Sequence, residues 1–134
     1  MKKISVIYTQ NLQTKAIHER SGRVLFTEAP VDNQGTGENF SPTDLVVTAL
    51  GSCILTVIGI ATKKYNFSFD GASVALGKTM VQDPRRIGAI DMTFDFSGLA
   101  LGDKEKKIVE YAIGNCPVMR SLHPDITKNI AFNY

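Results

Sequence analysis

A long uncharged segment near the middle of the chain constrains the fold more than any other feature. It lies within SPTDLVVTALGSCILTVIGIATKKY, residues 41–65, and the run from Leu45 to Thr62 spans 18 residues without a charge. That length is enough for a membrane-spanning helix. Threonine, serine, glycine and cysteine interrupt the run, however, and this composition favours a buried core helix. A chain of 134 residues supports one hydrophobic core, in which we expect this helix to lie.

Both ends of the segment carry helix signals. Ser41 is suited to the N-cap, Pro42 to the first helical position, and Asp44 to the third, where its carboxylate can bond back to the cap. Lys63 and Lys64 stand at the negative end of the helix dipole. The sequence therefore predicts one helix across the whole segment, with Asp44 as a capping residue.

Apolar residues occupy most of the circumference of this expected helix. One row, at four-residue steps, consists of Leu45, Ala49, Cys53, Val57 and Ala61, and a second apolar row runs beside it. We therefore expect protein to cover the helix on most sides. Gly51 and Gly59 would each cost roughly 1 kcal/mol in an exposed helix, so another backbone is expected to approach closely there.

The rest of the chain predicts short strands and two further helices. The expected strands are 3–9, 14–18, 23–27, 72–82, 87–96 and 126–134, and the expected helices are 102–116 and a short piece beginning at CPVMRSLHP, residues 116–124. Residues 31–40 form a polar loop. The order βββαββααβ predicts an α+β fold, with antiparallel sheets around a long central helix, in a single domain over residues 1–134.

Composition excludes several classes of function. The net charge is +2 and the 15 Lys and Arg residues are spread along the chain, so we expect neither a nucleic-acid partner nor a membrane partner. The N-terminal MKKISVIYTQ alternates like a strand rather than a signal peptide, so we expect a cytoplasmic protein. Structural disulfides are rare in that compartment. The two cysteines, 63 positions apart, are therefore either core thiols or a redox pair.

The local surroundings of each cysteine leave its role open. Cys116 precedes Pro117 at a helix start, with Arg120 one turn on, and both features favour a thiolate; a buried structural cysteine is the alternative. Cys53 lies among apolar residues, where a thiol is usually an inert small hydrophobe. A charged group from outside its helix would have to activate it. The candidates are Arg20, Arg23, Arg120 and His18.

Sequence spacing alone places neither Asp44 at the Cys53 thiol nor the histidines in a metal site. Asp44 precedes Cys53 by nine residues, about 13 Å along a helix, so it could act on the thiol only by holding a third residue. His18, His123 and the cysteines lack the close spacing of a zinc site. We expect no metal and no bound cofactor.

The combination FSPTDLVVTALGSC, followed about sixty residues later by NCPV, resembles the OsmC/Ohr family of thiol-dependent hydroperoxide reductases over nearly the whole chain. The resemblance implies an OsmC-like fold and an intertwined homodimer with active sites at the subunit interface. It also implies that Cys53 is the peroxidatic and Cys116 the resolving cysteine. Cys53 would reduce an organic hydroperoxide and become a sulfenic acid, Cys116 would form a disulfide with it, and an external dithiol or thiol protein would restore both.

The family pairs its reactive thiolate with an arginine that a glutamate orients. Arg20, in RSGR at residues 20–23, is similar to the R-x-G-R turn of the Ohr branch. Asp44 stands where the family usually has the longer glutamate, and Thr43 holds the position that the Ohr branch uses. These departures motivate an alternative, a dimer of the same fold that binds an apolar small molecule without efficient peroxidase activity. A purely structural dimer is the second alternative.

Overall fold

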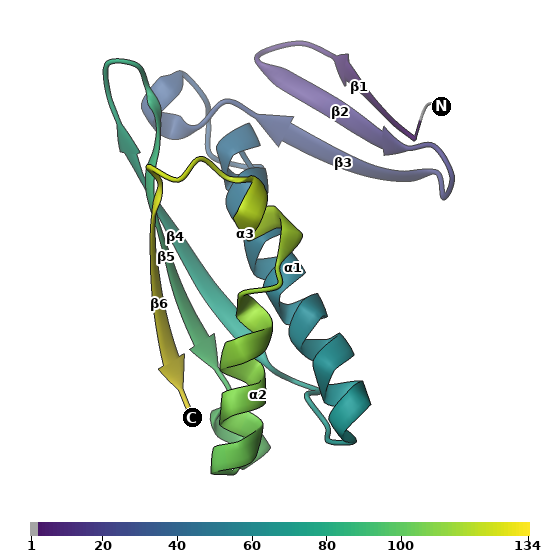
Figure 1. Ribbon diagram of the computed structural model, residues 1–134. Coiled ribbons are helices and arrows are strands. Elements are labelled where there is room, and N and C mark those ends of the chain that lie inside the picture. Colours follow the sequence, from purple (N-terminus) through teal and green to yellow (C-terminus); the bar gives the residue numbers. More distant parts are fainter. Residues whose placement is uncertain (1–2) are drawn as a thin grey trace. The chain divides into compact units, whose positions relative to one another are not determined.

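The computed structural model describes residues 3–134, in two compact units that divide between Val46 and Val47 (Figure 1). Its helices and strands follow the predicted order βββαββααβ, so the α+β fold class is confirmed. The structure also contains two short 3-10 helices that the sequence did not predict, at Val31–Asn33 and Ser97–Leu99. The first lies in the predicted loop at residues 31–40, and the second lies between an expected strand and an expected helix.

The N-terminal unit holds a three-stranded antiparallel sheet. Its strands are β1 (Ile4–Tyr8), β2 (Gln13–His18) and β3 (Arg23–Glu28), paired in the order β1-β2-β3. The turn at residues 19–22, between the two expected strands, is closed by the amides of Ser21 and Gly22, which both donate to the carbonyl of His18. Gly22 has a φ of +72°, a left-handed conformation that glycine adopts without strain.

The long helix α1 (Pro42–Tyr65) begins in the N-terminal unit and continues in the C-terminal one. The Asp44 amide donates to Ser41 Oγ at 3.1 Å, and Asp44 Oδ2 accepts from the Ser41 amide at 2.9 Å. These reciprocal bonds satisfy two amides that the first helical turn leaves without carbonyl partners. The predicted capping box is confirmed.

The C-terminal unit consists of helices on a second three-stranded sheet. Its elements are β4 (Ser73–Val81), β5 (Arg86–Asp95), α2 (Asp103–Ile113), α3 (Pro117–Ser121) and β6 (Thr127–Asn133). β4 and β5 pair in antiparallel fashion, whereas β6 pairs with β5 in parallel. The prediction of antiparallel sheets is therefore wrong for the β5–β6 pair. The parallel pairing follows from the crossover through α2 and α3, which returns the chain to the sheet in its original direction. Figure 1 shows α1 and α2 beside the sheet.

Alternate residues of β5 form the centre of the hydrophobic core. Ile90, Met92 and Phe94 are buried, together with Phe96 just after the strand. They pack against the buried side chains of the two helices, which are Val47, Leu50, Ile54 and Ile58 of α1 and Val109, Ala112 and Ile113 of α2. Cys116 belongs to the same cluster.

We expected protein to cover α1 on most sides. Within one chain, however, α1 is covered along a single stripe. The stripe consists of Val47, Leu50, Gly51, Ile54, Ile58 and Thr62. On another face Ile60 is 66% exposed. A Cβ on Gly51 would lie 2.7 Å from Leu76 Cδ1, so this glycine does permit a close approach, though of β4 side chains and not of a backbone. A Cβ on Gly59 would meet no atom within 4 Å, so no other part of the same chain approaches it closely, and an approach by a second chain stays a prediction.

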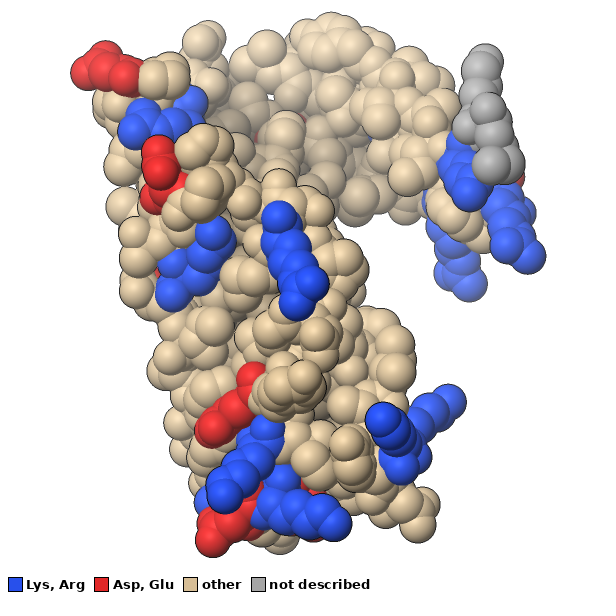
Figure 2. Space-filling model, viewed as in Figure 1, with Lys and Arg blue, Asp and Glu red and all other residues tan. Residues whose placement is uncertain are grey.

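Charged side chains on the face drawn in Figure 2 lie in small separate groups. Several Lys and Arg residues stand next to Asp or Glu residues, with wide uncharged areas between the groups. This view shows no extended basic surface, in agreement with the spread of Lys and Arg along the sequence.

Candidate functional site

The two cysteines lie near each other in the C-terminal unit, although 63 residues separate them in the sequence. Cys53 lies in the middle of α1 and is half-buried, whereas Cys116 precedes α3 and is fully buried. Both are free thiols, and Cys53 lies close enough to Cys116 to affect its pKa. Packing of α1 against the crossover from α2 to α3 therefore places two oxidisable thiols near each other. Of the two, only Cys53 is partly open to solvent.

Cys116 is the N-cap residue of α3, as its sequence context predicts. Its Sγ accepts from the Met119 amide at 3.3 Å, and a further bond comes from the Val118 amide. Pro117 has no N–H to offer at the first helical position, so these are the next amides available. A sulfur in this place has hydrogen-bond donors ready for a negative charge.

Of the two states that the sequence left open for Cys116, the thiolate and the buried thiol, the structure favours the buried thiol in the reduced protein. Burial raises the pKa of the Cys116 thiol, and the neighbouring Cys53 raises it further. These effects outweigh the two amides that lower the pKa, because a buried anion loses the hydration that it has in water. Reduced Cys116 therefore keeps its proton at neutral pH.

Arg120 does not act in the way that its spacing suggested. Its Nε donates to the Gly114 carbonyl at 3.0 Å, and the side chain is exposed. The guanidinium therefore connects the end of α2 to α3. This bond supports the position of Cys116 without placing a positive charge on its sulfur.

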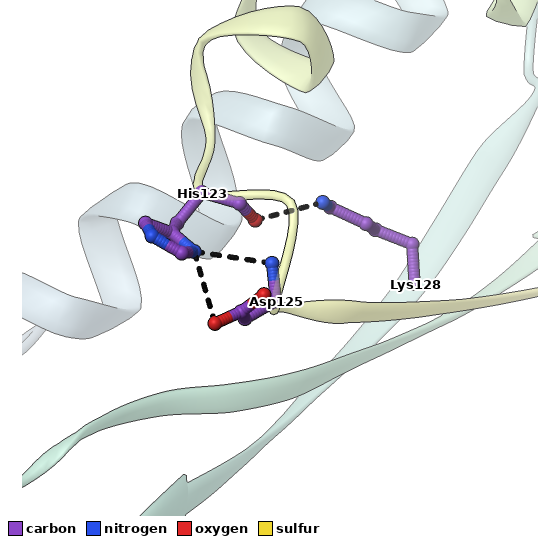
Figure 3. A network of polar contacts seen from close by, with 3 residues as sticks. All are labelled: His123, Asp125 and Lys128. Atoms are coloured by element: carbon purple, nitrogen blue, oxygen red, sulfur yellow. Dashed lines mark hydrogen bonds and ion pairs between the residues drawn. The ribbon is translucent and has the colours of Figure 1, made fainter.

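Local polar contacts hold the loop between α3 and β6 (Figure 3). His123 Nδ1 lies 3.1 Å from the Asp125 amide and 3.7 Å from Asp125 Oδ2, and Lys128 Nζ donates to the His123 carbonyl at 3.2 Å. His123 and Asp125 are both largely exposed. These local contacts therefore fix the loop, and the His123 ring contacts Asp125 within it. In residues 3–134 no group of three or more His, Cys, Asp or Glu side chains is placed to hold a metal ion.

The two residues predicted to activate Cys53 belong to the N-terminal unit. Arg20 is exposed in the turn between β2 and β3, and Asp44 is half-buried in the first turn of α1. His18, another candidate, contacts Ser21 Oγ through Nδ1 at 2.6 Å within the same turn. The contact of Arg20 with Cys53, and a role for Asp44 beyond capping, stay predictions.

Glu28 is a buried carboxylate that the sequence analysis missed. It is 2% exposed at the end of β3. It accepts from Thr36 Oγ1 at 2.8 Å, from the amides of Glu38 and Asn39, and from Gln13 Nε2. The bond from Thr36, followed by the other hydrogen bonds, lowers the pKa of Glu28 despite its burial. The available signal was an acid at a strand end directly before a polar, glycine-rich loop.

A groove lies between the C-terminal half of α1 and α2, with a volume of about 720 Å³. Its apolar lining consists mainly of Val57, Ile60, Ala61, Tyr65, Ile108 and Tyr111, and its lysines are Lys64, Lys104 and Lys107. We call it the α1–α2 groove. It lies on the side of α1 that the sheet leaves uncovered.

Comparison with known proteins identifies the family. Residues 35–131 match the profile of the family described as OsmC-like protein. A solved structure from Psychrobacter arcticus 273-4, provisionally described as an osmotic stress induced and detoxification response protein, is 41% identical, with a TM-score of 0.94 over 99% of this chain and 96% of that one. The comparison with curated proteins found no match.

More distant solved structures share the fold. An organic hydroperoxide resistance protein OsmC from Legionella pneumophila is 13% identical, with a TM-score of 0.77 over 98% of this chain and 95% of that one. The organic hydroperoxide resistance protein OhrB of Bacillus subtilis is 12% identical, with a TM-score of 0.72 over 98% and 96% of the two chains.

The chain has the OsmC-like fold and belongs to the OsmC-like family. Among residues 3–134, α1 is the one helix with the length and hydropathy to cross a membrane, and 33% of its most apolar window is buried in the single chain. In this soluble fold, α1 is the core helix. The resemblance inferred from the two cysteine motifs is confirmed.

Proposed function

We propose that the protein is a cysteine-based peroxidase that reduces organic hydroperoxides in the cytoplasm. The observation that carries the proposal is the proximity of two free thiols from distant parts of the chain, one half-buried and one buried. The names of the distant relatives, which include organic hydroperoxide resistance proteins, support the same substrate class.

Cys53 is the reacting thiol in this proposal, because it is the one with partial access to solvent. Its thiolate attacks the terminal oxygen of the hydroperoxide, the O–O bond breaks, and Cys53 becomes a sulfenic acid. Cys116 then attacks the Cys53 sulfur and releases hydroxide, which leaves a disulfide. An external dithiol or thiol protein reduces the disulfide, and no bound metal or cofactor takes part. Packing of Cys53 against the apolar core favours a hydrophobic peroxide.

A single-turnover assay tests the proposal. Reduced protein is mixed with one equivalent of cumene hydroperoxide and its free thiols are counted. We expect the loss of two thiols for each peroxide consumed. Cys53→Ser should consume no peroxide, and Cys116→Ser should form a sulfenic acid that dimedone traps. If both thiols of the wild-type protein survive excess peroxide, the proposed function is wrong.

We also propose a homodimer, because one chain leaves too much apolar surface open. Among residues 3–46 no hydrophobic side chain is buried, although β1 and β3 carry Ile4, Val6, Tyr8 and Phe26. A three-stranded sheet is stable in water only when an apolar face is covered. The helices α1 and α2 also expose apolar side chains, namely Ile60 and Tyr111. Tyr111 is 79% exposed. A second copy of the chain supplies apolar surface of the same kind.

The α1–α2 groove favours a second candidate function, the binding of an apolar small molecule. Its volume lies within the range of ligand pockets, roughly 300–1,000 Å³. Native mass spectrometry of the purified protein distinguishes the two functions. A retained apolar ligand, together with thiols that do not react with peroxide, would favour the binding protein over the peroxidase.

A further inference from the structure

A short linker between α2 and α3 carries the cysteine that completes the proposed disulfide. Helix α2 ends at Ile113 and α3 begins at Pro117, so the linker consists of residues 114–116, with Cys116 at its end. In the step proposed above, the Cys116 sulfur forms an S–S bond with Cys53 while hydroxide leaves the Cys53 sulfur. The rate of this step depends on how often the two sulfurs are correctly placed, because a disulfide permits only a narrow range of distances and dihedral angles.

Arg120 of α3 holds this linker at two points. Its backbone amide donates to the Cys116 carbonyl at 3.2 Å, and its side-chain Nε donates to the Gly114 carbonyl at 3.0 Å. The first bond belongs to the helical turn of α3, and any residue except proline could make it. The second bond requires a donor near the end of a long side chain. The identity of residue 120 therefore matters for the bond to Gly114.

Other hydrogen bonds of Cys116 join it to one helix at a time. Its amide donates to the Ile113 carbonyl of α2 at 3.2 Å, and its Sγ accepts from the Met119 amide of α3 at 3.3 Å. The Arg120 side chain instead joins the end of α2 to α3 across Cys116. This bond limits how far the two helix ends, and the sulfur between them, move relative to each other.

We propose that Arg120 is a positioning residue for disulfide formation, and that it acts through the hydrogen bond from Nε to Gly114 and not through its charge. This inference rests on the proposed peroxidase function and adds a residue to its second step. The Arg120 side chain is exposed, so water and salt screen its charge. Without the bond, the linker samples conformations in which Cys116 is misplaced, and the rate falls with the fraction of correctly placed molecules. Sulfenic acid formation on Cys53, which lies in α1, does not require the bond.

Two substitutions of similar side-chain length separate the hydrogen bond from the charge. Arg120→Gln removes the charge, but the glutamine amide nitrogen stands at the same position along the side chain as Nε and can donate to the Gly114 carbonyl. Arg120→Met removes both the charge and the donor. Arg86→Met is the matched control, because Arg86 is also exposed and also donates to backbone carbonyls, those of Gln82 and Pro84 in the β4–β5 turn.

Single-turnover kinetics with cumene hydroperoxide at pH 7 measure the two steps separately. Rapid quenching with an alkylating reagent, followed by mass spectrometry, counts the reduced, sulfenic acid and disulfide forms of each protein. We expect Arg120→Met to slow disulfide formation by about three- to tenfold, as the net loss of one hydrogen bond predicts, and to leave sulfenic acid formation unchanged. Arg120→Gln and Arg86→Met should both form the disulfide at close to the wild-type rate.

Three outcomes of this experiment would overturn the positioning role. The first is a wild-type rate of disulfide formation in Arg120→Met. The second is equal slowing by Arg120→Gln and Arg120→Met, which would assign the effect to the charge. The third is equal slowing of both steps in Arg120→Met, which would indicate a general structural defect.

A second oxidant separates this inference from the proposed function. The Cys53 thiolate adds to the N=N bond of diamide, Cys116 then displaces the reduced hydrazine, and a disulfide forms without any peroxide. We expect Arg120→Met, and not Arg120→Gln, to slow this displacement as well, and equal rates in the two variants would overturn the positioning role. A wild-type protein that forms the disulfide with diamide but keeps both thiols in excess peroxide would contradict the peroxidase function and leave the role of Arg120 to be judged by the diamide rates.

Discussion

At the scale of the residue, Glu28 joins the end of β3 to the loop that leads into α1. Its carboxylate accepts from Thr36 and from two loop amides. These bonds lower the pKa of Glu28 in the folded chain, so the unfolded chain binds a proton more readily. The stability that Glu28 contributes is therefore fully present above the unfolded pKa of about 4.3 and is lost as the pH falls through the folded pKa.

Glu28→Gln should make the free energy of unfolding less dependent on pH between about pH 5 and pH 3, because the variant has no carboxylate to protonate at this position. Urea unfolding of both proteins at several pH values measures this dependence. Glu38→Gln is the matched control, since the Glu38 side chain is exposed. Parallel curves for wild type and Glu28→Gln would show that the carboxylate has no special role in acid sensitivity.

Asp44 has a capping role in the structure and an activating role in the proposal, and two substitutions separate them. Asp44→Asn keeps an oxygen that can accept from the Ser41 amide but removes the charge. If the charge orients an arginine at Cys53, the peroxide rate should fall about tenfold or more, while stability falls by less than about 1 kcal/mol. Asp44→Glu, which restores the usual family residue, should retain the rate. A wild-type rate in Asp44→Asn would leave Asp44 as a cap alone.

At the scale of the element, Gly51 sets how closely α1 approaches β4. An added Cβ would lie 2.7 Å from Leu76 Cδ1 and 3.1 Å from Val74 Cγ1. The overpacking in Gly51→Ala should therefore destabilise the protein by about 1–3 kcal/mol. The better helix propensity of alanine should offset up to roughly 1 kcal/mol of this loss. Adding Leu76→Val, which removes the closest atom, should recover part of the loss in denaturant unfolding. A more stable Gly51→Ala protein would contradict this packing.

At the scale of the whole molecule, the open apolar faces predict a dimer in solution. Light scattering after size exclusion should give twice the chain mass of 14.6 kDa. Ile60→Glu would place an uncompensated charge at the contact, at a cost of about 3–5 kcal/mol, and should shift the protein toward the monomer. Gln82→Glu adds the same charge at the exposed β4–β5 turn and should leave the dimer intact. A monomeric wild-type protein would contradict the proposal.

The sequence alone determined the order of the elements and the start of α1. Strand alternation, helical periodicity and the Ser41–Asp44 cap are local signals, formed by residues within a few positions of one another. The two cysteine motifs also identified the family, and they named Cys53 and Cys116 as the pair to examine. Arg20 was one of four basic candidates from the residues, and only the family resemblance singled it out; its contact with Cys53 stays a prediction.

The tertiary structure decided what depends on distant neighbours and on burial. It brings Cys116 near Cys53 and raises the pKa of Cys116, where the local sequence had left both the thiolate and the buried thiol open. It buries Glu28 under its loop and covers α1 along one stripe only. No local pattern encodes these results, because desolvation and contacts across 63 residues arise only when the chain packs.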